Sequence, residues 1–412
     1  ALTPTVVGPG RVDALALIHN QVQSNMLGVS ENWSAALAPV KYSFVWNLPQ
    51  SAWAQWSGVV KDPLLRNGGE SLGVFVQMDL TSKTQAEGLF YSTIDFKGQF
   101  KLEQLLRRLA PPKWPEEIFG PIDRAKATKG SQLFGENCAG CHSRWPHRWS
   151  EPKKLGKRFI ENAIVSEKVV GTDSLQFRNP QFQADPTIIP GALGPFLEAP
   201  YTGAVLAPPP AVFLAATRGV FDRALKKLGL SDEELLDAHG FRAFYPDYQE
   251  PVPALFAYKA NAAEGMWASP PFLHNGSVPN LYELLLPAKE RSKTFFIGRE
   301  FDPMKVGVDT TGESGRFLFD TSLIGNSNAG QSFENGSGRG IIGRLLNDDE
   351  RWALVEYLKS IPAEARQITP YGGPKDPVQA WKDPTFFNVR NPGSYNGAPE
   401  LMPVPTADEK PR

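Results

Sequence analysis

Cysteine, histidine and an excess of charge of either sign are what this sequence has least of. Among its 412 residues there are 2 cysteines and 5 histidines, and 43 Lys and Arg against 44 Asp and Glu give a net charge of -1. A charge this close to zero argues against a nucleic-acid-binding surface built on bulk charge. No run of about 18 uncharged apolar residues occurs, which argues against a membrane-spanning helix.

Glycine, proline and tryptophan are plentiful. The chain has 37 Gly, 37 Pro and 10 Trp, while 41% hydrophobic and 21% charged residues are ordinary for a globular protein. Glycine and proline spread along the chain predict many turns and long ordered connections. The chain is long enough to bury a sizeable core.

Both cysteines lie in one short motif. The run Cys138-Ala139-Gly140-Cys141-His142 has the form C-x-x-C-H, the attachment pattern of c-type haem. Two thiols bond to the two vinyl groups of the porphyrin, and the adjacent histidine ligates the iron. The alternatives are a redox dithiol, which normally lies in a βαβ unit, and a zinc site, which needs further cysteines or well-spaced histidines. We find neither context and predict one covalent haem c, bound by Cys138 and Cys141, with His142 as the proximal ligand.

The sequence on both sides of the motif predicts a cytochrome c framework. Residues 127–134 form an amphipathic helical pattern in which Gly130 and Phe134 share a face, where class I cytochromes c cross their first and last helices. The polar cluster 347–350 is typical of a helix start, and an apolar stripe at i, i+3 spacing follows through 352–361. We therefore expect a first and a last helix that pack together.

These patterns suggest a mainly α fold with long ordered loops. We expect an N-terminal helical and loop segment at 1–115, an expanded class I cytochrome c domain at 116–362, and a proline-rich wrap at 363–412. About 200 residues separate His142 from the last helix, so we expect function to depend on this insertion. Further helices are expected at 12–22, 102–109, 215–228 and 232–238.

The predicted haem also indicates a compartment. Covalent haem attachment takes place outside the cytoplasm, so we expect a bacterial periplasmic or secreted protein. A chain that starts at Ala1 without a signal peptide is expected for a processed protein. Because haem attachment uses both thiols, we expect no disulfide.

Several separate motifs resemble known haem proteins. The run 266–281, which contains His274, resembles the histidine motif of bacterial di-haem cytochrome c peroxidases. The runs 8–14, 53–75 and 299–307 are more similar to the branch that contains the haem-c rubber oxygenase. The resemblance covers nearly the whole chain and implies an oxidoreductase that uses peroxide or dioxygen.

This chain differs from those relatives in its number of haem motifs. They carry two C-x-x-C-H motifs, and the single one here matches their C-terminal haem by its order along the chain. Residues 1–110 match the segment between the two haems. The N-terminal haem has been lost, or another chain carries it, or this chain is a fragment.

The resemblance also bears on the sixth iron ligand. In the oxygenase branch an Asn-x-Gly-His run supplies a distal histidine, whereas here Asn328-Ala329-Gly330 is followed by Gln331. The methionine ligand of the peroxidase branch corresponds to Ala288, which cannot ligate. Since an amide is a poor ligand for ferrous iron, we expect a weakly held or open sixth position. Met304 and, less favoured, Met266 could ligate if their loops fold over the haem, although methionine is often core filler.

Other polar residues have two possible roles each. His274 would lie near the haem edge or donate to the distal ligand, or it would be a structural histidine that holds its loop. Arg144, Arg148 and Lys153 would neutralise the haem propionates or form a solvated basic face. Surface or capping roles are expected for His19, His147 and His239.

The resemblance also implies roles for a group of aromatic residues and for two carbonyls that would bind calcium. Trp53, Trp56 and Phe75 would line the distal side of the haem that this chain lacks, and without that haem they are expected to form a core or an interface. Because an exposed set of Trp46, Trp53 and Trp56 would make a large apolar patch, we predict that residues 1–110 pack as an interface. The backbone carbonyls of Ser269 and Pro271 correspond to calcium-binding carbonyls in the peroxidases. We therefore keep calcium as a possible second cofactor.

Two functions follow from these observations. The chain is either a haem oxidoreductase that activates peroxide or dioxygen, with His274 and Gln331 as site residues, or a mono-haem electron-transfer subunit without catalysis of its own. The expected partners are a redox protein or a chain that carries the missing haem, in a homo- or hetero-oligomer. The sequence does not indicate the substrate.

Overall fold

A computed structural model describes most of the chain. The described residues are 5–58, 60–74, 76–107, 109–144, 147–150, 158–178, 187–189, 192–240, 243, 257–311 and 316–361. Phe75, Lys153 and the expected wrap at 363–412 lie outside them.

The described residues form α-helices of 4 to 20 residues and strands of 2 to 4 residues. The helices are α1 (Ala14–Asn20), α2 (Pro63–Ser71), α3 (Phe96–Leu106), α4 (Glu116–Phe119), α5 (Arg124–Asn137), α6 (Glu167–Val170), α7 (Leu175–Arg178), α9 (Pro209–Leu228), α10 (Asp232–His239), α12 (Leu281–Leu284) and α13 (Asp348–Ser360). A π-helical turn, η1 (Gln21–Met26), extends α1, and 3-10 turns occur at η2 (Ser30–Asn32), η3 (Leu48–Gln50), η5 (Gly194–Phe196), η7 (Met266–Ala268) and η8 (Ala288–Glu290).

The strands form separate pairs, each of two strands. Antiparallel pairs are β1 (Arg11–Val12) with β2 (Val40–Lys41), β3 (Ile164–Ser166) with β6 (Ala257–Lys259), β4 (Thr187–Ile188) with β5 (Leu206–Ala207), β7 (Thr294–Ile297) with β10 (Phe317–Asp320), and β8 (Phe301–Asp302) with β9 (Gly307–Val308). Strands β11 (Ser332–Phe333) and β12 (Ile341–Gly343) pair in parallel. These pairs tie loops together and do not form a continuous sheet.

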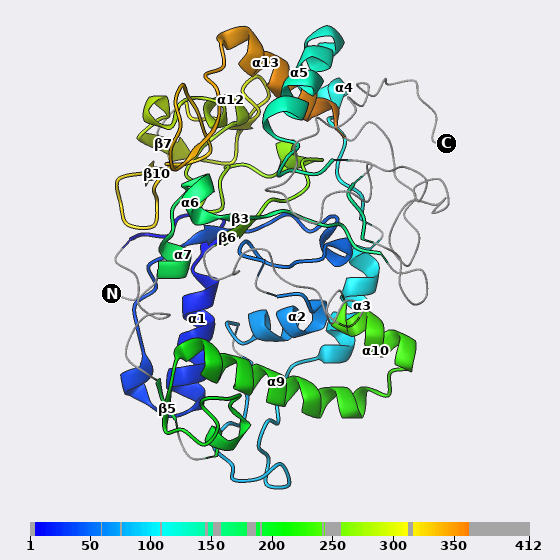
Figure 1. The fold of residues 1–412 in the computed structure, drawn as a ribbon, viewed down its shortest axis with the longest axis vertical. Coiled ribbons are helices and arrows are strands. Elements are labelled where there is room, and N and C mark those ends of the chain that lie inside the picture. The colour runs from blue at the N-terminus through cyan, green and yellow to red at the C-terminus, as the bar shows by residue number, and fades with distance from the viewer. Residues whose placement is uncertain are drawn as a thin grey trace.

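The elements gather into two helical regions (Figure 1). Helices α4, α5, α12 and α13 lie together at one end, and α1, α2, α3, α9 and α10 lie at the other, with β3 and β6 between them. The second region has its own buried cluster, which joins residues of the N-terminal segment, such as Leu64 and Phe90, to Val212 and Val220 of α9. The N-terminal segment therefore shares a core with part of the long insertion.

Helix α5 leads into the haem motif and crosses α13 closely. A Cβ atom added to Gly130 would lie 1.9 Å from the carbonyl oxygen of Ala353 and 2.7 Å from Cβ of Tyr357. Phe134, one turn further along α5, contacts the Tyr357 ring at a centroid distance of 5.3 Å. The helix crossing predicted from Gly130 and Phe134 is therefore present, and it depends on the absence of a side chain at Gly130.

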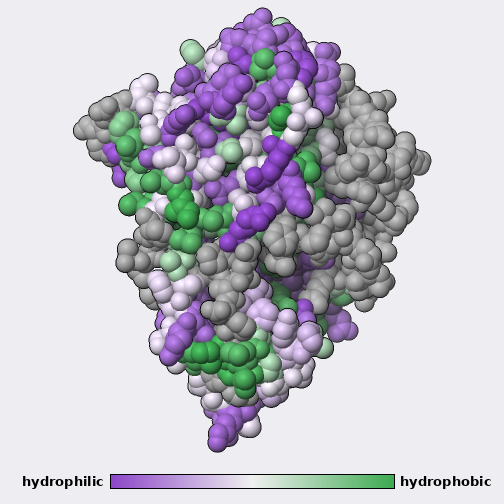
Figure 2. All heavy atoms as spheres, turned by 60° about the vertical axis from the view of Figure 1, so that its left-hand side comes forward, coloured by the Kyte–Doolittle hydropathy of each residue, from purple (hydrophilic) through white to green (hydrophobic). Residues whose placement is uncertain are grey.

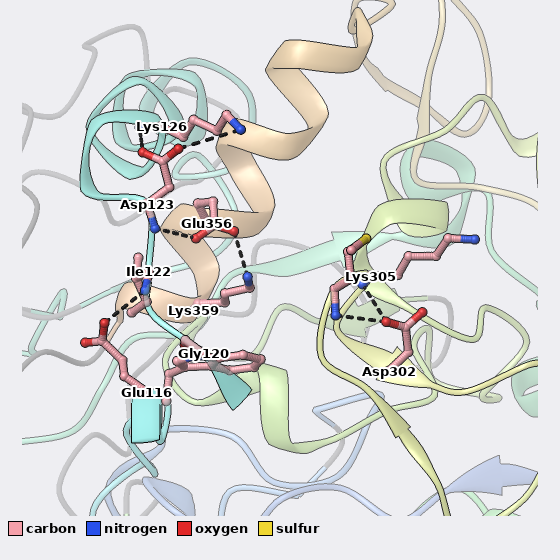
Figure 3. Close-up of polar contacts among 11 residues, drawn as sticks. Glu116, Gly120, Ile122, Asp123, Lys126, Asp302, Lys305, Glu356 and Lys359 are labelled. Carbon is pink, nitrogen blue, oxygen red and sulfur yellow. Dashed lines mark hydrogen bonds and ion pairs between the residues drawn. The ribbon is translucent and has the colours of Figure 1, made fainter. Parts of the chain in front are cut away.

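Polar contacts fix both helices at their ends (Figure 3). The backbone N–H of Asp123 donates to a carboxylate oxygen of Glu356 in α13 at 2.9 Å, and Lys359 forms an ion pair with the same residue at 2.6 Å. Helix α13 begins with a capping box, in which Asn347 and Glu350 each bind the other's backbone N–H. The polar cluster in the sequence thus marks the helix start as predicted.

The expectation of an exposed tryptophan set is wrong, and the alternative of a core is found for Trp53. Trp53 is only 2% exposed and packs with Phe159 and Ile164. Trp46 and Trp56 are half-buried, and their indole N–H groups donate to the carbonyls of Glu264 and Lys41, each at 3.0 Å. The insertion supplies the partners of Trp46 and Trp53, and the N-terminal segment itself supplies the acceptor of Trp56, so the aromatic set gives no support to an interface.

On the face that Figure 2 shows, apolar areas lie between hydrophilic ones. Ile188 and Leu206, which face each other across β4 and β5, are 44% and 49% exposed. Within the described residues, no helix has the length and apolar character needed to cross a membrane.

Candidate haem site

The C-x-x-C-H motif forms a tight helical turn at the end of α5. The backbone N–H of Cys138 donates to Phe134 O at 2.9 Å, which continues the helix, and those of Cys141 and His142 donate to Cys138 O at 3.1 and 2.9 Å. Both cysteines are free and half-buried. The turn holds the thiols and the imidazole on one short stretch of backbone, as covalent haem attachment requires.

One hydrogen bond orients the His142 ring. Its Nδ1 lies 2.8 Å from the backbone carbonyl oxygen of Asn261, an acceptor, so Nδ1 carries the proton and Nε2 keeps its lone pair for a metal. In a histidine that ligates a metal, the other ring nitrogen commonly donates such a hydrogen bond, which fixes the orientation of the ring. Burial lowers the pKa of His142, and this effect exceeds the opposing effect of the bond to Asn261, which favours the neutral form that ligates iron.

The electrostatics of the thiols argue against redox chemistry at the motif. Burial raises the pKa of Cys138 to about 12 and also raises the pKa of Cys141, despite the opposing charge of Arg148. Reactive dithiols have lowered thiol pKa values. No group of three or more His, Cys, Asp or Glu side chains among the described residues could hold a metal ion. The raised thiol pKa values therefore argue against a redox dithiol, while the C-x-x-C-H turn and the oriented His142 ring fit haem c.

Two arginines that follow the motif form hydrogen bonds that hold its backbone and link it to the helix crossing. Arg148 donates to the carbonyls of Gly140 and Cys141 at 3.4 and 3.2 Å. Arg144 is buried and donates to the Tyr357 hydroxyl and, at 3.2 Å, to Ser131. Arg144 thus joins the motif to the crossing of α5 and α13 and is not part of a solvated basic face.

The segment that carries Gln331 is held by a buried arginine. Arg291, 3% exposed, donates to the backbone carbonyls of Asn328, Gly330 and Gln331 at 2.7, 2.8 and 2.8 Å. It also donates to the carbonyl of Leu284 at 3.0 Å. A single guanidinium therefore fixes the segment to the loop after α12.

The backbone of the Gln331 segment also packs closely against residues 170–172. The Gln331 N–H donates to Val170 O at 2.9 Å, and Gln331 has a φ of 44°, in the left-handed region. A Cβ atom at Gly330 would lie 2.3 Å from the backbone nitrogen of Thr172. The next strand, β11, places Phe333 in the same buried cluster as Phe134, with Cys138 packed against it. A Cβ atom at Gly343 of β12 would lie 2.9 Å from the Phe333 ring and 3.0 Å from Asn137 Oδ1, so the end of the Gln331 segment lies near the residue that precedes the motif.

The structure assigns His274 a structural environment. Its ring stacks on Tyr258 at a centroid distance of 4.3 Å, and its Nε2 lies 3.0 Å from the Tyr258 hydroxyl. Burial lowers the pKa of His274 to about 3, so the ring is neutral at neutral pH. The backbone carbonyl of His274 accepts a bond from the Lys41 N–H at 2.8 Å. His274 therefore holds its loop in place.

The candidate methionine ligands lie in different surroundings. Met304 is 69% exposed in the turn between β8 and β9, where its backbone N–H and that of Lys305 donate to Asp302 (Figure 3). Met266 begins η7 and packs partly buried against the apolar cluster that contains Phe134. An exposed thioether in a closed turn is a poor candidate for an iron ligand.

The expectation of surface or capping roles for the remaining histidines is wrong in two cases. His19 is 3% exposed and stacks on Phe213, and His147 is fully buried, with its Nε2 3.8 Å from a carboxylate oxygen of Glu264. His239 is half-buried and contacts Asp62 through Nδ1 at 2.7 Å. Helical context alone did not reveal that these rings pack between elements distant in sequence.

The Ser269 carbonyl, expected to bind calcium, has another partner. The ammonium group of Lys41 donates to Ser269 O and, at 3.1 Å, to Ser269 Oγ. A cation supplied by the chain thus occupies this acceptor, so Ser269 O does not fit a calcium ion. The Pro271 carbonyl as a calcium ligand stays a prediction.

Comparison with known proteins indicates a haem c protein, as the geometry of the motif does. Residues 257–296, which include Asn261, His274 and Arg291, match the family model described as RoxA-like, cytochrome c-like. This part of the chain, called the RoxA-like segment below, is thus similar to that family. It implies a haem-c oxidoreductase type of protein and haem c as the cofactor, in agreement with the motif at 138–142.

Two relatives extend the similarity along the chain. The uncharacterized protein y4iJ of Sinorhizobium fredii is 36% identical over 375 residues, which cover 86% of this chain and 60% of the relative. The uncharacterized protein y4iM of the same organism is 26% identical over 266 residues, which cover 64% of this chain and 48% of the relative. The chain therefore spans about half to three-fifths of the length of these relatives.

Asn261, Arg291 and Lys41 are parts of the site that no sequence motif indicates. Asn261 acts through its backbone carbonyl, so its side chain is uninformative. Arg291 and Lys41 are buried cations, and charged residues are expected at the surface unless paired. Position within the RoxA-like segment is the one feature that points to Arg291.

Proposed function

We propose that this chain is a periplasmic or secreted c-type haem oxidoreductase related to the di-haem peroxidases and oxygenases. The observation that carries the proposal is the His142 ring, whose bond to Asn261 leaves Nε2 available on the turn that holds Cys138 and Cys141. The RoxA-like segment, which contains Asn261, supports the same function.

In this proposal the protein residues hold and orient the cofactor. Cys138 and Cys141 would bind the haem covalently, and His142 would ligate its iron. When bound, the haem would supply a redox-active iron that activates peroxide or dioxygen or relays electrons to a partner haem. Arg148 fixes the backbone of the motif, and Arg291 holds the Gln331 segment beside it. The buried cluster around Phe134 and Phe333 would shield one side of the haem from water.

A second candidate is an electron-transfer subunit without its own catalysis. The environment of His274 favours it, because a neutral ring held by Tyr258 with a pKa of about 3 is a poor proton donor or acceptor at neutral pH. In this case we expect a strong sixth ligand and a partner protein that carries the acceptor. A partner chain with the second haem is compatible with either candidate.

We expect the identity of residue 331 to control the spin state of the haem. If Gln331 stands at the sixth position, the ferric wild type should be at least partly high-spin and the ferrous form should bind carbon monoxide rapidly. An amide or water splits the iron d-orbitals less than an imidazole does. Gln331→His should shift the optical spectrum to low-spin and slow carbon monoxide binding, since histidine tolerates the left-handed conformation found there.

Gln331→Ala is the matched control, because it removes the amide without adding a ligand and should leave carbon monoxide binding fast. Sharp low-spin bands and no carbon monoxide shift in the wild type would contradict an open position. That result would favour the electron-transfer subunit.

A further inference from the structure

A buried lysine approaches the RoxA-like segment from the N-terminal part of the chain. Lys41, in β2, is 7% exposed, and its ammonium group donates to Ser269 O and Ser269 Oγ. The Phe272 and Trp56 rings lie around it, with centroids 5.7 and 6.0 Å from Nζ. Aromatic faces at this distance attract a cation.

The backbone of Lys41 binds the same loop. Its N–H donates to His274 O at 2.8 Å, so Lys41 contacts both Ser269 and His274. Arg11, its register partner in β1, donates to Asn275 O at 2.9 Å. The β1–β2 pair thus delivers two positive side chains to the loop 269–275.

The surroundings of Ser269 suit a single ammonium group and not a metal ion. Calcium prefers roughly six to eight oxygen ligands, usually with carboxylates among them. No metal-binding group of His, Cys, Asp or Glu side chains exists among the described residues. A divalent ion beside Ser269 O would also meet the positive charge of Lys41.

We propose that the ammonium group of Lys41 is the built-in cation of this loop, so that 269–274 is fixed without a bound metal. Lys41 thereby docks the N-terminal segment onto the haem-binding part of the chain. Phe272 and Leu273 belong to the buried cluster against which Cys138 packs, so the cation also stabilises one wall of the haem site. This inference does not depend on which oxidant the haem activates.

The first test uses the wild-type holoprotein. Its thermal unfolding is measured with excess calcium chloride and with EDTA, at pH 6, because burial lowers the pKa of Lys41 to about 7 and the amine must carry its proton. We expect the same Tm in both. A Tm that rises with calcium and falls with EDTA would overturn the proposal.

The second test removes the charge and keeps the volume. In Lys41→Met, amide hydrogen exchange in the peptide 269–276 should be roughly tenfold faster or more, since hydrogen bonds to charged groups contribute at least that factor. Lys61→Met is the matched control, because Lys61 lies 4.6 Å from the Trp53 ring centroid in the same segment and should leave this peptide unchanged.

Wild-type exchange rates at 269–276 in Lys41→Met would overturn the proposal. If that variant does not fold, Lys41→Gln provides the same comparison, because it keeps a donor for Ser269 but carries no charge.

Discussion

Replacing Gly130 by alanine should destabilise the protein by about 3 kcal/mol or more. In a free helix the same change would stabilise by about 1 kcal/mol, because alanine is the better helix former. The new Cβ would lie 1.9 Å from the carbonyl oxygen of Ala353, and backbone atoms of α13 cannot move aside without separating the two helices. The sign of the effect therefore reports on the helix crossing. Chemical denaturation of the holoprotein measures it.

Gly69→Ala, in α2, is the matched control for this prediction. A Cβ atom at Gly69 would lie 3.4 Å from the Phe213 ring, an ordinary contact distance, so the variant should lose no more than about 0.5 kcal/mol relative to the wild type. A Gly130→Ala variant as stable as the Gly69→Ala variant would show that α5 and α13 do not cross at Gly130.

Arg291→Ala should cost at least about 3 kcal/mol of folding stability. The guanidinium is buried and binds the carbonyls of Asn328, Gly330, Gln331 and Leu284, so its removal leaves several buried acceptors without a donor. The Gln331 segment should also lose its fixed backbone. We therefore expect faster amide exchange at 328–333 in addition to the lower denaturation midpoint.

Arg299→Ala is the control for that prediction, because Arg299 is exposed in the same part of the chain. It should change stability by less than about 0.5 kcal/mol. If Arg291→Ala behaved like Arg299→Ala, the Gln331 segment would not depend on the buried guanidinium.

Elements with local signals could be predicted from the sequence. Helix α13 has a capping box at Asn347 and a regular apolar stripe, and α5 combines helical periodicity with Gly130 at the crossing. The helices at 215–228 and 232–238 were also expected, although α9 begins earlier, at Pro209, since proline is favourable at the first helical position.

Elements that depend on distant partners could not be predicted. Most strands have two or three residues, too few for a periodic pattern, and their partners are mainly supplied by separate parts of the chain. The buried environment of His147 and the acceptor of Trp46 likewise depend on Glu264, which is distant in the sequence. The bond from His142 to Asn261 joins residues 119 positions apart.

The proposal that this chain carries haem c is tested most directly by the purified protein after denaturation. We expect one haem per chain, retained on a denaturing gel as a haem-stained band at 45.3 kDa. The stain should be absent when Cys138 and Cys141 are both replaced by alanine, and present in Ala139→Ser, which changes only a residue between them. Haem that separates from the denatured wild-type chain, or a stain that survives in the double variant, would contradict covalent attachment at this motif.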